Sequence, residues 1–128
     1  MKKTKRIHIA GHEVALNYSV LAVETIEDMI PGDEKNVARF LYSENGKDNI
    51  ERTHKIAEVM MEEGNAYEKI INGESYKVFK ADELKTILTI KETMELRDQL
   101  VETMLESMGR KVEVEPEKNA QTAQPEKA

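Results

Sequence analysis

The fold is decided by residues 6–16, which read RIHIAGHEVAL. Its apolar residues alternate with a histidine in the first half and with an alanine in the second, which is typical of two strands that each bury one face. Between them lies Gly11-His12, and a glycine at the first central position of a two-residue loop favours a type II′ turn. The sequence therefore predicts a hairpin with two apolar pairs on one face, Ile9 opposite Val14 and Ile7 opposite Leu16.

A lone hairpin is only marginally stable in water, so its apolar face has to pack on the helices that follow. Asn17 or Ser19 can cap a first helix that runs to about Ile30 and is stopped by Pro31-Gly32. Helical spacing and turn residues predict five further helices, over residues 33–42, from 48 or 49 to 64, over 66–71, from 82 to 88 and from 90 to 108.

Some of the later helix boundaries are marked by specific sequence signals, and others allow two interpretations. Thr89 and Glu92 have capping-box spacing, in which each side chain bonds the backbone amide of the other, so a new helix or a kink starts there. Gly109 marks the end of this helical segment. Asn72-Gly73 is either a helix C-cap or a second hairpin turn leading to a strand over residues 76–79, and both readings stay open. The apolar stripe of the last helix is predicted at Met94, Val101, Leu105 and Met108, flanked by Leu100 and Met104.

The length of 128 residues fits one domain with additional sequence at an end. We predict an α+β domain over residues 1–109, with the hairpin packed on a mostly helical bundle. Beyond Gly109 only Val112 and Val114 are sizeable apolar residues, too few to offset the entropy of ordering the chain. Residues 110–128 are therefore predicted to be a disordered polar tail.

Composition narrows the class of partner and the compartment. The formal charge of −6 opposes general attraction to nucleic acid, and the chain contains no cysteine, in agreement with a reducing compartment. The basic start resembles a signal peptide, but polar residues from His8 to Glu13 interrupt the apolar segment that should follow. No apolar run approaches the roughly 18 residues of a membrane span. We expect a cytoplasmic protein that binds neither membranes nor nucleic acid.

Nothing in the sequence indicates catalysis, a metal or a cofactor. The only histidines are His8, His12 and His54; the predicted hairpin places His8 opposite Ala15 and His12 in the turn, so neither has a second ligand beside it. His54 is expected to flank a core stripe. Adjacent acidic residues on a helix point about 100 degrees apart and do not converge, and no phosphate loop, nucleophile elbow or zinc-protease motif is present. We expect that the protein is not an enzyme.

Methionine is the informative residue type, because seven among 128 residues is a high content. Flexible thioethers fill irregular gaps in a core, and they also suit surfaces that accept varied apolar partners. Both interpretations stay open. The candidate partner-binding residues under the second are Met60, Met61, Met104 and Met108.

The order of these elements resembles the tail assembly chaperones of long-tailed, siphovirus-like bacteriophages and prophages. In that family a small hairpin of the kind I-x-G-x-x-x-x-L, matched here by residues 9–16, precedes the first helix. Residues 56–68 and 80–84 are similar to the family's middle helix, its glycine break and its acidic-start helix, and a polar tail closes the chain. The likeness covers most of residues 5–109 and brings no catalytic residues with it.

The resemblance implies a chaperone that binds the tape-measure protein, a very long helical polypeptide, and keeps it soluble in the host cytoplasm before the tail tube polymerises. Such a client exposes apolar stripes that aggregate unless they are covered. The alternative is a small regulatory adaptor that inhibits one protein partner by a helix-in-groove contact. A DNA-binding regulator ranks last, because the helices over 48–63 and 90–108 are mixed or acidic. Self-association is left open.

Overall fold

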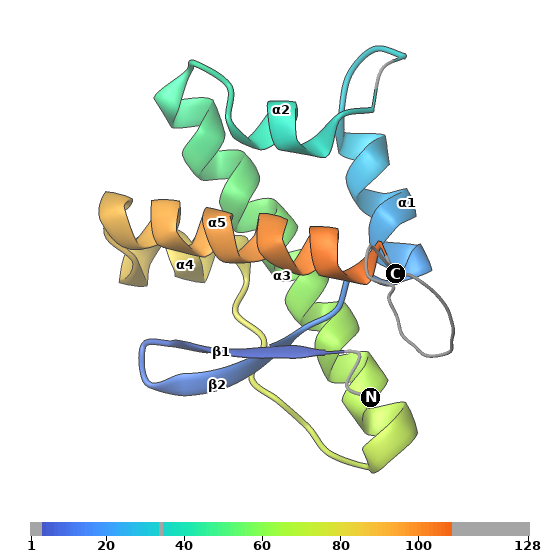
Figure 1. Cartoon of the computed structure of the whole chain (residues 1–128). Helices are drawn as coiled ribbons and strands as arrows, with labels where there is room; N and C mark the ends of the chain where they lie inside the picture. The colour runs from blue at the N-terminus through green and yellow to red at the C-terminus, as the bar shows by residue number, and fades with distance from the viewer. Residues whose placement is uncertain (1–3, 34, 109–128) are drawn as a thin grey trace, which may run out of the picture.

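The computed structural model describes residues 4–33 and 35–108. In these residues an antiparallel hairpin precedes a set of helices (Figure 1). The elements are β1 (Lys5–Ile9), β2 (His12–Leu16), α1 (Val20–Met29), α2 (Val37–Leu41), α3 (Gly46–Asn72), α4 (Ala81–Ile87) and α5 (Ile90–Ser107). The predicted α+β class, with a hairpin on a mostly helical bundle, is confirmed. The predicted boundary at residue 109 and the tail over 110–128 lie outside the described residues.

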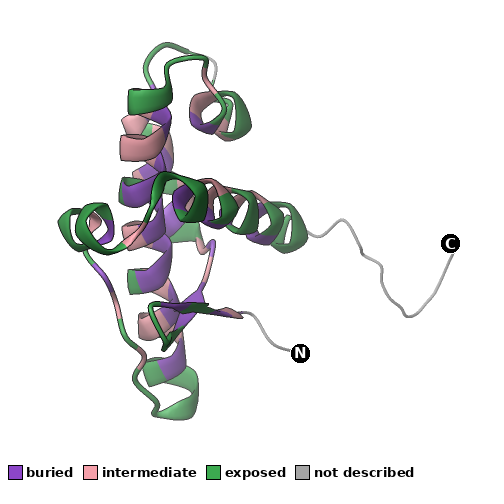
Figure 2. Cartoon of the chain, turned by 90° about the vertical axis from the view of Figure 1, so that its left-hand side faces the viewer, coloured by how far each residue is buried: buried purple, intermediate pink, exposed green. Residues whose placement is uncertain are grey.

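Helix α3 is the axis of the fold, since β2, α1, α2, α4 and α5 all pack against it. Figure 1 shows α5 crossing the middle of α3, with the hairpin beside the C-terminal half of α3 and α1 and α2 beside its N-terminal half. The buried residues follow α3 and the faces turned toward it (Figure 2). They are mainly Leu, Ile, Val, Ala and Met, as expected for a chain without tryptophan.

The prediction that a helix ends near Gly64 and that a separate one covers residues 66–71 is wrong, because α3 runs without a break to Asn72. Gly64 is buried inside the helix against β2. A glycine therefore stands here to let two backbones approach, although it reads as a helix stop in the sequence. The helix ends at Gly73, whose left-handed φ of 67° forms the C-cap, so of the two readings of Asn72-Gly73 the C-cap is confirmed.

The predicted hairpin is present, but its register is wrong by two residues. Ile7 pairs with Val14 and Ile9 with His12, so the loop is Ala10-Gly11 and His8 lies opposite Glu13. Both loop residues have positive φ, 50° and 81°, as a type I′ turn requires. A shift of two residues keeps the same apolar side chains on one face, and so the alternation pattern does not distinguish the two registers.

The first two helices are set by their caps. Ser19, one of the two predicted candidates, caps α1 by accepting from the amide of Ala22 at 3.1 Å. The predicted start of the second helix at Asp33 is wrong, since α2 begins at Val37. Asn36 is its N-cap and accepts from the amide of Arg39 at 3.0 Å. An asparagine side chain that accepts from the amide three residues later favours the N-cap position over the helix interior, and so Asn36 fixes the start of α2.

Helix α5 starts at the predicted capping box, in which Thr89 and Glu92 bond each other's amides at 3.0 and 2.9 Å. Its predicted apolar stripe is wrong in part, because Leu105 and Met108 are exposed. The buried face consists of Leu96, Leu100 and Met104 together with two threonines, Thr93 and Thr103. Thr93 forms a hydrogen bond with His54 of α3 at 2.9 Å. A search for apolar residues at helical spacing misses threonines on a buried face, where their hydroxyl groups are hydrogen-bonded.

Candidate functional site

Three of the four predicted partner-binding methionines, Met60, Met61 and Met104, belong to the buried core, and Met108 is exposed. Met60 and Met61 of α3 are 0% and 1% exposed and belong to the core, so in this conformation they form no part of a binding surface. They are the gap-filling methionines of the alternative that the sequence left open. Met104 and Met108 lie one turn apart near the end of α5 and line the same groove.

This groove has a volume of about 380 Å³ and lies between α1, α5 and the segment that leads into α2. One wall is apolar and comes from the last turns of α5. Across the groove stand Tyr18, which precedes α1, and Val37 and Ala38 at the start of α2. Glu27, Lys35 and Asn36 supply its polar groups. An apolar concavity with a few polar groups is the usual form of a binding site. The α5 wall consists of Val101, Met104, Leu105 and Met108.

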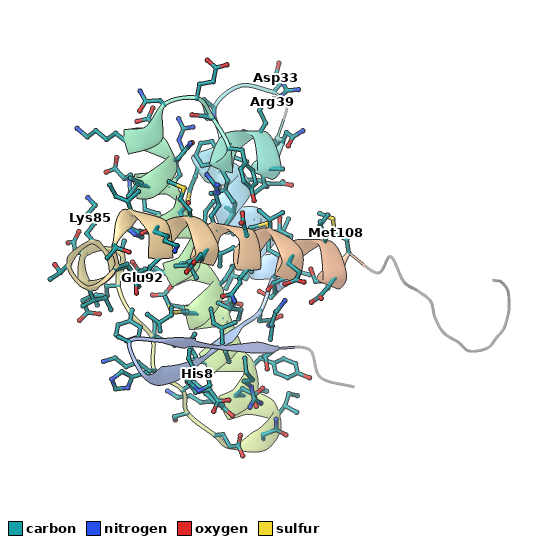
Figure 3. All side chains as sticks on the ribbon, turned by 60° about the vertical axis from the view of Figure 1, so that its left-hand side comes forward. His8, Asp33, Arg39, Lys85, Glu92 and Met108 are labelled. Atoms are coloured by element: carbon teal, nitrogen blue, oxygen red, sulfur yellow. The ribbon has the colours of Figure 1, made fainter. Side chains whose placement is uncertain are left out.

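Apolar side chains are exposed beside the groove. Met108 is 64% exposed at the end of α5, where Figure 3 shows it beyond the body of the domain. Val20, 77% exposed, lies seven residues before Glu27 and therefore on the same face of α1. Single exposed apolar residues are ordinary, whereas several around one apolar groove indicate a surface for an apolar partner.

The helix α2 that closes the groove is held by arginines of the neighbouring helices. The guanidinium of Arg52 in α3 lies 4.2 Å from the ring centre of Phe40, and that of Arg97 in α5 lies 4.1 Å from the ring centre of Tyr42. The Tyr42 hydroxyl also donates to Asp98 at 2.6 Å. These cation–π contacts and the hydrogen bond fix the α2 side of the groove relative to α3 and α5.

Two polar groups of the groove interact with α1, one with its C-terminal end and the other with the side chain of Glu27. Lys35 donates from Nζ to the carbonyl oxygen of Ile30 at 2.6 Å, at the position where α1 ends. Burial raises the pKa of the Tyr18 phenol, and the negative charge of Glu27 raises it further. Tyr18 thus stays neutral and presents an aromatic surface. Sequence reasoning did not single out Tyr18, because it precedes a helix and belongs to no periodic stripe.

The histidines do not come together. His8 is exposed, and His12 packs edge-on against Phe79 with ring centres 5.7 Å apart. His54 is buried beside Thr93, and burial lowers its pKa, with the charge of Lys85 as a second cause. In residues 4–33 and 35–108 no group of three or more histidines, cysteines and carboxylates is placed to hold a metal ion.

One buried carboxylate escaped sequence reasoning. Glu68 in the last third of α3 accepts from Thr4 Oγ1 at 2.6 Å, from Arg6 at 3.0 Å and from Asn72 at 2.7 Å. The hydrogen bond from Thr4 is the largest of the effects that lower its pKa to about 2. Through Thr4 and Arg6, Glu68 anchors the start of β1 to α3. Thr4 and Arg6 lie more than sixty residues away from it in the chain, and therefore no local pattern could indicate it.

Comparison with known protein families, curated proteins and solved structures yields no match for this chain. None of the helices in the described residues combines the length and the apolar character needed to cross a membrane.

Proposed function

We propose that this protein is a chaperone that binds an apolar stripe of a helical client, and that the client is the tape-measure protein of a phage or prophage tail. The carrying observation is the groove lined by Met104 and Met108, beside which apolar side chains are exposed. Support for the particular client comes from the resemblance of residues 5–109 to tail assembly chaperones. The chaperone would act in the host cytoplasm, where tails are assembled.

The groove suits side chains that project from a client helix. An amphipathic helix presents apolar residues at spacings of three and four, and its partner needs a hollow for them and a neutral wall around it. The exposed Met108 can change rotamer above the buried Met104, and so the groove can accept different apolar side chains along a repetitive client. The wall opposite is held by the arginine–aromatic contacts of α2, which limits the ordering cost on binding.

The experiment is co-expression of the full chain with the tape-measure protein of the same phage, followed by measurement of soluble client and of the mass of the complex. We expect many copies of this chain on each client and loss of soluble client with Met108→Asp. The matched control is Ile70→Asp, which places the same charge on an 80% exposed residue of α3 whose position does not line the groove. This control should retain client binding.

Two outcomes would contradict the proposal. If Met108→Asp and Ile70→Asp reduced the amount of soluble client equally, the groove would not be part of the binding surface. A complex of one chain with one small globular protein, obtained by affinity purification after phage induction, would favour the regulatory adaptor. Photocrosslinking from position 108, compared with position 70, identifies which chain occupies the groove without relying on a loss of function.

A further inference from the structure

Helix α1, which flanks the groove, carries negative charge and has no basic residue of its own. Helix α1 contains Glu24, Glu27 and Asp28 and no lysine or arginine from Val20 to Met29. Helix α5 contains acidic residues and no lysine or arginine after Arg97. Those acidic residues have partners within the chain, because Lys5 of β1 forms ion pairs with Glu102 and Glu106, and Asp98 accepts from the Tyr42 hydroxyl. Lys35 is the one cation among the described residues that line the groove.

The ends of both helices add to this charge. Glu27, in the last turn of α1, and Met104, in the last turn of α5, both line the groove. The C-terminal end of a helix carries about half a negative charge, and basic residues in the last turn usually offset it. Neither α1 nor α5 has a basic residue there. Glu27 and Asp28 instead place like charge at the negative end of α1, where Lys35 donates to the carbonyl oxygen of Ile30. Glu106, at the end of α5, is paired with Lys5.

The position of the acidic side chains on α1 relates them to the groove. Val20, Glu24 and Glu27 are spaced by four and three residues and thus share one face of the helix, on which Glu27 lines the groove. Glu24 is exposed on that face. A helix lying along the groove would therefore have its apolar stripe against Met104 and Met108 and one edge of that stripe beside Glu24 and Glu27.

We propose that the groove selects an amphipathic helix whose apolar stripe is flanked by lysine or arginine. This inference rests on the proposed function and adds the charge of the client segment to it. Cationic side chains at the edge of the stripe would meet Glu24 and Glu27 on the acidic face of α1, which increases the association rate and the specificity. An acidic flank would meet like charge at the same positions, which disfavours the complex.

The test is binding of two fluorescent peptides to the full chain, each about 18 residues long so that it spans about five helical turns. They share one leucine stripe, and its flanking positions are lysine in one peptide and glutamate in the other. We expect the lysine peptide to bind about tenfold more tightly at about 50 mM salt. The difference should shrink to about twofold at about 500 mM salt, since exposed charges are then screened.

A charge-matched pair of variants locates the effect. Glu24→Gln with Glu27→Gln should reduce the preference for the lysine peptide to about threefold or less, with little change for the glutamate peptide. Glu13→Gln with Glu44→Gln removes the same charge from exposed residues that do not line the groove, and should keep the tenfold preference. Circular dichroism of the two peptides, with and without protein, checks that both flanks allow equal helicity.

The outcomes separate this inference from the proposed function. Equal affinity for both peptides, or tighter binding of the glutamate peptide, overturns the charge preference and leaves helix binding intact. Absence of binding for both peptides counts against the proposed function as well. Binding of the lysine peptide only after Arg110 and Lys111 are changed to Gln would assign the groove to this chain's own basic residues, and would overturn the inference.

Discussion

Gly64 in the middle of α3 lies directly against the backbone of Ala15 in β2. A Cβ atom at Gly64 would stand 1.8 Å from the carbonyl oxygen of Ala15 and 2.9 Å from the nitrogen of Leu16. The next residue of the chain, Asn17, donates from its amide to the carbonyl oxygen of Met60 at 3.1 Å. The exit of the hairpin is therefore seated on α3 through backbone atoms, at a point that only glycine can occupy.

Replacing Gly64 with alanine tests this contact. In an open helix the change would stabilise the protein by about 1 kcal/mol, because alanine has the higher helix propensity. Here the methyl group has to displace β2, and we expect a net loss of about 3 kcal/mol in the free energy of unfolding. Gly46→Ala is the control, since nothing lies within 4 Å of its Cβ position. Urea unfolding of both variants measures the difference, and equal stability of the two would contradict the packing argument.

The sequence predicts features that depend on neighbouring residues and misses those that depend on distant ones. The hairpin and the Thr89 capping box follow from local chemistry and are present. Gly64 was misread because its reason to be glycine is Ala15, far away in the chain. The candidate groove follows the same rule. Sequence spacing indicates Met104 and Met108 together on α5, whereas Tyr18 reaches them only through the tertiary fold.

Loss of the capping box should weaken α5 at its first turn. The Thr89 hydroxyl accepts from the amide of Glu92, and without it that donor has no partner from the cap. We expect Thr89→Ala to lower the free energy of unfolding by about 1 kcal/mol, and Thr89→Ser to retain most of it. Thermal unfolding of the two variants in parallel gives the comparison. A serine variant as unstable as the alanine variant would show that the threonine methyl matters more than the hydroxyl.

His54 should make the stability depend on pH near neutrality. Burial, together with the charge of Lys85, lowers the pKa of this imidazole below its ordinary value of 6.5. At a pH just below 6.5 the unfolded chain binds a proton at His54 and the folded chain does not, so the free energy of unfolding falls as the pH decreases from about 7 to about 5.

Urea unfolding across that range measures the dependence, with His54→Gln as the comparison. The glutamine variant has no titrating group at this position and should show a flatter profile. It also keeps a polar side chain beside Thr93, whose hydroxyl lies 2.9 Å from the imidazole Nε2. Identical slopes for the two proteins would mean that another group governs the pH response.

Glu68 should affect the stability at lower pH than His54 does. Its pKa is lowered from the ordinary 4.5 to about 2, chiefly by the hydrogen bond from Thr4, with Asn72 and Arg6 also contributing. Its contribution to stability is therefore complete above about pH 4.5 and is lost as the pH falls toward 2. Glu68→Gln should destabilise the protein at neutral pH and flatten its acid dependence. The control Glu74→Gln alters an exposed carboxylate and should change neither.

The methionines should separate into two groups when each is shortened to alanine. Met60 is fully buried between α3 and its neighbours, and its replacement leaves a cavity that costs about 3 kcal/mol in the free energy of unfolding. Met108 is mostly exposed, and its replacement should change stability by less than about 0.5 kcal/mol. The affinity for a leucine-stripe helix should fall with Met108→Ala and change little with Met60→Ala, because of these two methionines only Met108 lines the groove. Unfolding and peptide titration on the same two variants measure both quantities. A Met108→Ala protein with unchanged affinity would mean that the end of α5 does not contact the helix, and the groove would then be a feature of packing alone.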